Sequence, residues 1–483
     1  MAGLFGLSVS SCLESCHFPN WLYWGTSSVR HLGEDNCGLA VTDGKLLKSE
    51  SHPGLFSSNF RHRMGDFKGL NGIGYCGLAE EPFWARNSKF GPFALCFSGN
   101  ITNREKLILE FDDQGRIFER GDDAEVIANL IVQGKEDILE GIKFMDQKVE
   151  GAYVLLILTK VGIYAVRSSS GQWPLVLGSH QTSDAICISS DSVGFNNLGF
   201  VPDKELEPGE IVFLYNGTEP LAQQDYRLNG KSKIRRCSFW PVYASSPADC
   251  PYGRPANLVR EELGACLAKK DIASGFIPHI VMPVPDSGIS HALGYFQEFC
   301  FQMMTGKVGR IPIYKRGLIR YGFYRSFLAP TPEEREQRAH HKIVITSERI
   351  SDFLDTLQEA GLEVMVREIV DSKTIKIVIC DDSIVRGTQI RTSLAPKLRL
   401  IFEEDGFRVE IHVRISYPEL LSHCPYGKTT KEGEILAVRL PKIEDRVREL
   451  GVKSIVYNTL DDLERALEIP RCELCIACAL PSS

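Results

Sequence analysis

The residue pattern with the clearest chemistry is a pair of adjacent acids, Asp381 and Asp382, that follows an apolar run at residues 375–380. The residues that follow are Ser383, Ile384, Val385, Arg386, Gly387 and Thr388. Two neighbouring carboxylates at the end of a strand can accept hydrogen bonds from two vicinal ribose hydroxyls. The hydroxyls of Ser383 and Thr388 and the close backbone approach at Gly387 suit a phosphate at a helix N-terminus. The pattern therefore predicts a sugar-phosphate site.

An ordinary strand-to-helix turn is the simpler interpretation, with one aspartate as the helix cap. A single cap needs neither a second acid nor the Ser, Gly and Thr that follow, so we favour the binding site.

Other candidate motifs are weaker. Residues 72–77 match the G-x-G-x-x-G spacing of dinucleotide sites, but polar and basic residues precede them where that motif needs a strand, so we expect a plain turn. Gly-Lys-Ser at residues 230–232 lacks the earlier glycine of a phosphate loop, because position 225 is Asp. The sequence identifies no partner for His31, His340 or His341, and surface or packing roles are expected.

The residues around the acid pair carry a resemblance to a known family. DDSIVRGT at residues 381–388 resembles the phosphoribosyl-pyrophosphate loop of the amidophosphoribosyltransferases, the glutamine-dependent enzymes that open purine synthesis. The similarity continues in PVPDSG at 283–288, GLIR at 317–320, RSF at 325–327 and HVRIS at 412–416. Residues 340–379 match poorly and are longer than the family pattern.

The resemblance implies a role for each matched residue. Asp381 and Asp382 would hold the ribose hydroxyls and Mg²⁺, while Arg320 and Arg325 would face the pyrophosphate. The implied substrate-binding residues are Asp286, Ser287, Ser383, Ile384, Val385, Arg386, Gly387 and Thr388. Breaking the bond between ribose C1 and pyrophosphate builds charge on both fragments, which Mg²⁺ and arginines would stabilise.

The first half resembles the glutaminase domain of the same family, with its chemical groups replaced. That domain begins with a nucleophilic cysteine in a start like CGIFGI, where this chain has Ala2 in AGLFGL. The family's glutamine-binding arginine corresponds to Gly77, and its oxyanion-hole asparagine corresponds to Ser98, which precedes Gly99. The acid Asp123 is retained. Alanine has no nucleophile and glycine cannot pair with a carboxylate, so we predict a domain that does not hydrolyse glutamine.

Four of the 15 cysteines carry a second resemblance. An odd number of scattered cysteines fits free thiols or metal ligands in a reducing compartment. Cys237, Cys424, Cys475 and Cys478 each match a cysteine that ligates a [4Fe–4S] cluster in the cluster-bearing branch of the family. Four thiolates form a complete ligand set for such a cluster. Zinc is the competing ligand and free buried thiols are the third interpretation; Cys472 leaves the register of the tail open.

The elements that must position these residues differ between the two halves. In the first half, strands are expected at residues 38–41, 94–97, 152–158 and 162–166, with a helix at 123–133. A last strand near 208–213 and a polar connector at 216–236 would close this half. In the second half, strands at 277–284, 375–380 and 409–415 alternate with helices at 258–269, 289–300 and 391–402. That alternation predicts a parallel, doubly wound sheet.

Combined with the resemblance, this pattern implies two folds in one chain. Residues 1–235 would form an α+β domain like the N-terminal nucleophile hydrolases, a class II glutamine amidotransferase four-layer sandwich. Residues 236–465 would form an α/β type I phosphoribosyltransferase domain with a parallel sheet, and residues 466–483 a cysteine-containing tail. A length of 483 residues accommodates two to four domains.

Composition excludes several classes of protein. The chain has 24% charged and 43% hydrophobic residues and a net charge of −7, which is typical of a globular protein and disfavours a nucleic-acid binder. The longest apolar run, residues 152–158, is far shorter than the roughly 20 residues that span a bilayer. The start has no basic segment typical of a secretory signal. We expect a cytoplasmic protein with no membrane or nucleic-acid partner, and by family analogy a homo-oligomer.

Two functions from different classes follow. The first is a phosphoribosyltransferase that takes ammonia, free or from a separate partner, or another amine, and releases pyrophosphate. The alternative is a non-catalytic regulator that binds phosphoribosyl pyrophosphate or a nucleotide and pairs with an active paralogue. The intact acid pair favours the enzyme. Residues 321–324, one residue shorter than the family's flap over the substrate, favour the regulator.

Overall fold

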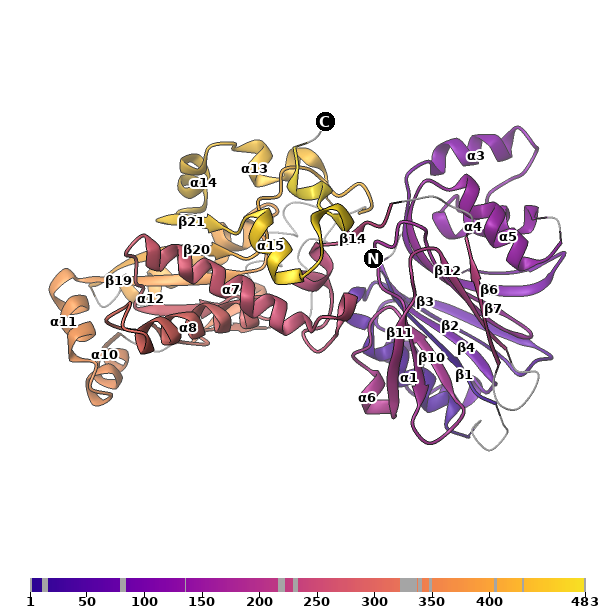
Figure 1. Ribbon diagram of the computed structural model, residues 1–483, viewed down its shortest axis with the longest axis horizontal. Coiled ribbons are helices and arrows are strands. Elements are labelled where there is room, and N and C mark those ends of the chain that lie inside the picture. The colour runs from indigo at the N-terminus through magenta and orange to yellow at the C-terminus, as the bar shows by residue number, and fades with distance from the viewer. Residues whose placement is uncertain are drawn as a thin grey trace.

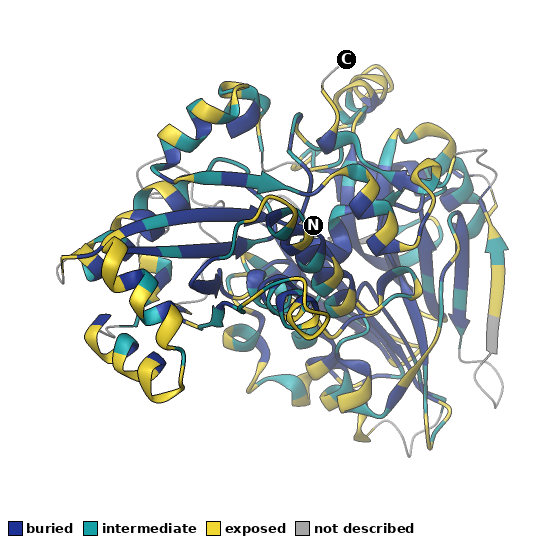
Figure 2. Cartoon of the chain, turned by 60° about the vertical axis from the view of Figure 1, so that its left-hand side comes forward, coloured by how far each residue is buried: buried dark blue, intermediate teal, exposed yellow. Residues whose placement is uncertain are grey.

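The computed structural model describes residues 2–10, 16–78, 84–134, 136–215, 222–228, 233–321, 337, 341–346, 350–403, 406–427 and 430–481. Within these residues, two bodies of secondary structure lie side by side (Figure 1). One contains two antiparallel sheets and the other a parallel sheet. The central strands of all three sheets are largely buried, whereas edge strands and the outer helices carry exposed residues (Figure 2).

In the first body, a seven-stranded sheet packs on a six-stranded sheet, counted over the described residues. The seven strands, in spatial order, are β11 (Phe200–Glu205), β9 (Val176–His180), β10 (Ile186–Ser189), β1 (Gly3–Ser8), β4 (Asn71–Gly77), β2 (Asn36–Thr42) and β3 (Leu47–Pro53). The six are β13 (Ala222–Arg227), β12 (Glu210–Tyr215), β8 (Gly162–Arg167), β7 (Gly151–Thr159), β6 (Gly91–Ile101) and β5 (Trp84–Ser88). Leu4, Ile73 and Leu156 are fully buried in the core that the two sheets share.

Helices cover both outer faces and complete four layers. The helices α1 (Phe18–Ser28), α2 (Phe56–Phe60) and α6 (Phe195–Leu198) share a core with the seven-stranded sheet. The helices α3 (Arg104–Asp112), α4 (Asp123–Gln133) and α5 (Ile138–Lys148) share a core with the other sheet. The helix α4 begins as expected from the sequence, because the Asp122 side chain accepts a hydrogen bond from the Glu125 N–H over 2.9 Å.

The prediction of a turn at residues 72–77 is wrong. These residues form β4, a fully buried strand between β1 and β2. The glycines are present because α1 lies directly on the strand: a Cβ on Gly72 would stand 2.8 Å from Phe18 Cζ, and one on Gly74 would overlap Thr26. The spacing therefore reflects helix-on-sheet packing and not a dinucleotide loop.

The prediction of a polar connector at residues 216–236 is also wrong in part. Part of it, β13, pairs antiparallel with β12, so β12 is not the last strand of this body. The strand β13 is an edge strand whose described side chains are largely exposed, and it therefore lacks the apolar run that marks a buried strand. Lys204 Nζ reaches Asp225 Oδ2 over 2.9 Å and holds this edge.

The second body is built on a parallel sheet, as the alternation of strands and helices predicts. Its order is β16 (Ile313–Tyr314), β15 (Ile280–Pro283), β19 (Thr374–Asp381), β20 (Arg408–Ile415) and β21 (Ser454–Tyr457). One face packs on α7 (Ala256–Ala273) and α8 (Gly288–Met304). The other packs on α10 (Ile350–Glu359), α11 (Glu363–Ser372), α12 (Ala395–Glu403) and α14 (Ile443–Leu450). The poorly matching stretch 340–379 thus supplies α10, α11 and the central strand β19.

A buried ion pair fixes α7 and α8 to the sheet. Arg414 in β20 donates from Nε and Nη2 to the two carboxylate oxygens of Asp271 over 2.6 and 2.8 Å. Tyr295 Oη donates to the same carboxylate over 2.6 Å. Removing one partner of such a buried pair costs about 3–5 kcal/mol of stability, because the other charge is left buried and unpaired. No helix among the described residues is long and apolar enough to cross a membrane.

Candidate functional site

The acid pair lies at the carboxyl end of the central strand of the parallel sheet. The strand β19 ends at Asp381, and its neighbour β20 ends at Ile415. The Ser416 N–H donates to Asp381 O over 3.0 Å, and the Tyr417 N–H donates to Asp382 O over 2.8 Å. The end of β20 therefore fixes both acids at the edge where open α/β sheets bind ligands.

The environment of the two acids opposes their joint ionisation. Asp382 is buried, and its N–H donates to Asp381 Oδ1 over 2.9 Å. Ser383 Oγ donates to Asp382 Oδ2 over 2.6 Å. Burial, followed by the charge of Asp382, raises the pKa of Asp381 well above its usual range. Donor hydroxyls or a cation would relieve this unfavourable charge, and a ribose or a metal ion supplies one or the other.

Three of the residues expected to bind the substrate or its pyrophosphate lie beside the acid pair. Asp286 and Ser287 follow β15, and Ser287 Oγ donates to Asp381 Oδ1 over 3.4 Å. Arg320, in β17 (Leu318–Arg320), pairs with Asp286 through an Nη1–Oδ2 distance of 3.0 Å. The structure therefore brings Arg320, Asp286 and Ser287 to the acid pair. Arg325 lies outside the described residues.

The middle of the acid loop (residues 381–388) is anchored to the chain that precedes α14. Ile384 is buried in the sheet core, so this residue can offer a ligand only its backbone. Val385 O accepts a hydrogen bond from the Leu436 N–H over 2.7 Å. Arg386 Nε donates to Glu434 Oε2 over 3.0 Å, and a second guanidinium nitrogen reaches the same oxygen. A phosphate that binds Arg386 would therefore replace the Glu434 carboxylate as the anionic partner of the guanidinium.

The end of the acid loop requires a glycine. Gly387 has φ +74°, in the left-handed region, and a Cβ there would stand 2.5 Å from Leu450 Cδ2. The helix that follows begins at Thr388. Its first N–H groups are directed at the loop, which gives the end of the loop the character of an anion site.

In the first body, the position of the family's nucleophile is closed. Ala2 is fully buried, and its backbone N–H donates to Ser98 Oγ over 2.8 Å. Ser98 lies in β6, and the next residue, Gly99, pairs with Tyr153 of β7. A Cβ on Gly99 would overlap the Ala152 carbonyl. Ser98 therefore binds the chain's own backbone at the place where the family carries an oxyanion donor.

The position of the family's glutamine-binding arginine is filled by a tyrosine. Gly77 is the last residue of β4, and a Cβ there would overlap Tyr75 Oη. The Tyr75 side chain is fully buried and donates to Leu78 O over 3.3 Å. Gly33 packs directly on the Gly77 backbone. An arginine side chain at position 77 would therefore require the buried Tyr75 side chain to move.

The retained acid of the first body has a structural partner. Asp123 is buried at the first turn of α4, where its Oδ2 accepts from the Ile101 N–H over 3.2 Å. Its Oδ1 lies 3.5 Å from Arg104 Nη1. These contacts tie α4 to β6 and α3.

The four matched cysteines come together between the two bodies. Cys237 in β14 (Arg236–Cys237) pairs in register with Cys475 in β22 (Leu474–Cys475). Cys478 O accepts from the Leu421 and Ser422 N–H groups, which places the tail against the segment that carries Cys424.

The four thiols also interact with one another. Burial and neighbouring thiols raise the pKa of Cys237, that of Cys424 to about 11 and that of Cys478 to about 12. Cys472 is exposed. Within the described part of the chain, no three or more His, Cys, Asp or Glu side chains are grouped so that they could hold a metal ion.

One polar group escaped the sequence analysis. His31 has a partner, Asp191, with an Nε2–Oδ2 distance of 3.0 Å. The two residues are 160 positions apart, and no local motif marks either of them. The sequence therefore held no signal from which this pair could be found.

Comparisons with known proteins cover both bodies. A family model described as a glutamine amidotransferase domain matches residues 78–196. The amidophosphoribosyltransferase of Methanocaldococcus jannaschii is 30% identical, covering 99% of this chain and 96% of the relative. That of Bacillus subtilis is 29% identical, covering 95% of this chain and 90% of the relative.

Solved structures match over the same length. Glutamine phosphoribosylpyrophosphate amidotransferase from B. subtilis, complexed with ADP and GMP, gives a TM-score of 0.78 at 27% identity, covering 99% of this chain and 96% of that one. The expected fold class is thereby confirmed: a glutamine amidotransferase fold of the N-terminal nucleophile type joined to a phosphoribosyltransferase fold. By its sequence and by the fold of both bodies, this chain belongs to the amidophosphoribosyltransferase family.

Proposed function

We propose that this protein is a phosphoribosyltransferase that transfers ammonia or another amine to C1 of phosphoribosyl pyrophosphate and releases pyrophosphate. The observation that carries the proposal is the meeting of Asp381, Asp382 and Ser287 at the carboxyl ends of β19 and β15. Two carboxylates that repel each other destabilise a fold, so a protein without a ligand for them has no reason to keep both. The names of its relatives support the same reaction.

The chemistry follows from where charge develops. Asp381 and Asp382 accept hydrogen bonds from the ribose hydroxyls, and the end of the acid loop binds the 5′-phosphate. Arg320, released from Asp286, stabilises the departing pyrophosphate, and we assign the same role to Arg325. The adjacent carboxylates also suit Mg²⁺, a cation that prefers oxygen ligands and that would neutralise pyrophosphate charge. The protein positions the amine over C1 and excludes water.

We further propose that the first body does not hydrolyse glutamine. The support is the combination of Ala2, which has no nucleophile, with Tyr75 in the space of the carboxylate clamp and Ser98 bonded to the Ala2 N–H. Ammonia would then come from solution or from a separate protein. The proposed functional units keep the boundaries 1–235, 236–465 and 466–483, in a cytoplasmic homo-oligomer without nucleic-acid or membrane partners.

For the four cysteines we propose a [4Fe–4S] cluster that joins the tail to the start of the second body. A Zn²⁺ ion would need its thiolates about 2.3 Å from one point. The cysteines of a cubane cluster each bind a different iron, so their sulfurs stand further apart. The interaction of Cys237 with Cys424, Cys475 and Cys478 supports a site made of four thiolates, and the resemblance of these four positions to the cluster-bearing branch of the family favours the cluster over zinc.

The test is pyrophosphate release from phosphoribosyl pyrophosphate with Mg²⁺, on anaerobically purified protein. Glutamine, ammonium chloride or neither is added, and Asp381→Asn is the matched control. Release with ammonium but not with glutamine, lost in the variant, is the expected result. Release with glutamine alone would contradict the inactive first body.

The runner-up is a regulator that binds phosphoribosyl pyrophosphate or a nucleotide without turnover. The observation in its favour is the ion pair of Arg386 with Glu434, because it occupies a side chain that the phosphate needs. Calorimetric titration with phosphoribosyl pyrophosphate and Mg²⁺ separates the two proposals. Tight binding without pyrophosphate release under any amine would favour the regulator.

A further inference from the structure

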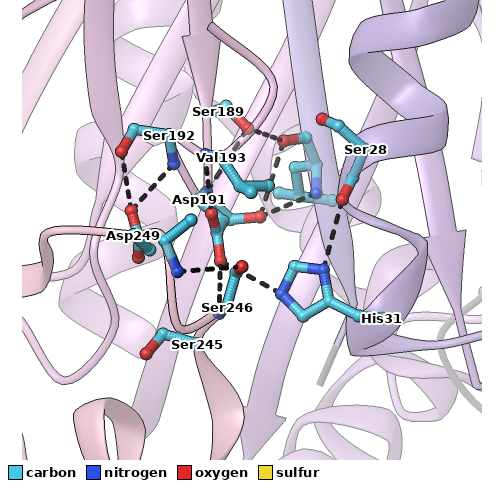
Figure 3. A network of polar contacts seen from close by, with 12 residues as sticks. Ser28, His31, Ser189, Asp191, Ser192, Val193, Ser245, Ser246 and Asp249 are labelled. Carbon is cyan, nitrogen blue, oxygen red and sulfur yellow. Dashed lines mark hydrogen bonds and ion pairs between the residues drawn. The ribbon is translucent and has the colours of Figure 1, made fainter. Parts of the chain in front are cut away.

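Two buried acids clasp the two bodies together (Figure 3). Asp191 follows β10 in the first body, and Asp249 precedes α7 in the second. The Ser246 N–H donates to Asp191 Oδ2 over 3.0 Å, while the N–H and Oγ of Ser192 donate to Asp249 Oδ1 over 3.0 and 2.7 Å. Each acid thus accepts an N–H from the segment that carries the other. We call Asp191, Ser192, Ser246 and Asp249 the carboxylate clasp.

The two acids of the clasp differ in their donors. Asp191 is 0% exposed and also accepts from the Val193 N–H over 2.8 Å at Oδ1, with His31 Nε2 3.0 Å from Oδ2. Asp249 is 2% exposed, and it accepts from the N–H and Oγ of Ser192 and from the backbone of Cys250.

The buried cation beside the clasp cannot neutralise every acid that it faces. Arg260, in α7, faces Asp382, Asp191 and Asp249, so that one positive charge serves three carboxyl groups. Its Nε and Nη2 donate to backbone carbonyls instead, to Pro241 O over 2.9 Å and to Ser245 O over 2.7 Å.

The remaining neighbours of the clasp are one imidazole and one thiol. His31 lies on the Asp191 side with its side chain 30% exposed, and the thiol of Cys250 follows Asp249 in the chain. Burial and then the charge of Asp191 raise the pKa of Asp249 to about 7. Two adjacent buried acids with one partly shared cation are most stable when one of them is neutral.

We propose that the carboxylate clasp holds one proton in mildly acidic solution, on Asp249, and that loss of this proton as the pH rises through neutrality loosens the joint between the two bodies. The same Arg260 that faces the clasp faces Asp382 of the acid loop, so the clasp is placed to report pH to that loop. The proposal uses no substrate and does not depend on the proposed function.

The direct test is infrared difference spectroscopy of the full chain, wild type minus Asp249→Asn, across pH 5–9. Asparagine keeps an oxygen acceptor for Ser192, so this variant imitates the protonated clasp. We expect a carboxylic-acid carbonyl band at pH 6 that disappears with a midpoint near pH 7. In Asp191→Asn the band should disappear at a lower pH than in the wild type, because the Asp191 charge that opposes ionisation of Asp249 is gone. A purely structural role for Asp191 would not move the midpoint.

Urea unfolding gives the second readout. The folded pKa of Asp249 lies above its unfolded value, so the wild type loses stability relative to Asp249→Asn as pH rises from 4 to 7. The ratio of the two unfolding constants should change by about tenfold per pH unit in this window and be flat above it. Asp271→Asn, which breaks the pair with Arg414, is the buried control and should be destabilised throughout. Parallel wild-type and Asp249→Asn curves, or the absence of the band at pH 6, would overturn the proposal.

Discussion

The Tyr75 side chain occupies the space in which a side chain at position 77 would have to lie, because a Cβ on Gly77 overlaps Tyr75 Oη. This relationship makes the proposed loss of the glutamine clamp more than a single substitution. Ala2, Ser98 and the Gly77–Tyr75 pair differ from the family pattern together, and the surrounding core has closed over them. Reversing one residue therefore does not restore the site.

We predict that Gly77→Arg destabilises the protein by about 1–3 kcal/mol, the usual cost of overpacking a core. The triple variant Ala2→Cys, Gly77→Arg, Ser98→Asn should release no glutamate from glutamine, because Tyr75 still fills the clamp. Urea unfolding and a glutamate assay measure the two effects. Gly65→Arg is the matched control, since a Cβ on Gly65 meets nothing within 4 Å and this variant should be nearly neutral. A stable triple variant with glutaminase turnover would refute this interpretation.

For the acid pair, we predict opposite effects of Asp381→Asn on stability and on binding. The folded pKa of Asp381 is raised, so its ionised form costs stability at all pH values above about 4. At pH 7.5 the ligand-free variant should therefore be more stable than wild type. Its affinity for phosphoribosyl pyrophosphate with Mg²⁺ should fall tenfold or more.

Thermal unfolding and titration calorimetry measure these two changes. Asp355→Asn, at an exposed position of α10, removes the same charge and should alter neither. A ligand-free Asp381→Asn variant that is less stable than wild type would show that the carboxylate is structural.

A third prediction concerns the end of the acid loop. Gly387→Ala places a methyl group 2.5 Å from Leu450 Cδ2 at a positive φ, so we expect a loss of about 1–3 kcal/mol. Leu450→Ala removes the clash but not the backbone strain. In a double-mutant cycle the two substitutions should therefore couple favourably by about 0.5–3 kcal/mol. Gly433→Ala, in open space, is the control for the glycine replacement, and additive values in the cycle would argue against the contact.

The second body could be predicted closely from the sequence, because its strands are buried on both faces. A largely apolar run marks β19, and apolar residues at every second position mark β20. The helix expected at residues 391–402 lies within the helical turns that run from Ile390 to Glu403. The acid loop was also predictable, because all of its members are adjacent in the chain.

The first body was less predictable because its signals are not local. The glycines of β4 are needed because α1 packs closely on that strand. The strand β13 is polar because it is an edge strand. Asp191 contacts Ser246 within the clasp and His31 beside it, and only the tertiary fold brings these residues together. Hydrophobic periodicity carries no information about such contacts.

The last prediction tests the tail. Anaerobically purified protein should contain about four iron and four sulfide per chain, and Cys475→Ser should lose them, because Cys475 pairs in register with Cys237. Cys472→Ser is the matched control: it lies three residues away in the same tail but is exposed, so it should keep full iron content. Loss of the cluster should also expose β22 to proteolysis, because the raised pKa values of Cys424 and Cys478 leave neutral thiols that no longer bind the tail. Equal iron loss in both variants, or zinc in place of iron, would contradict the assignment.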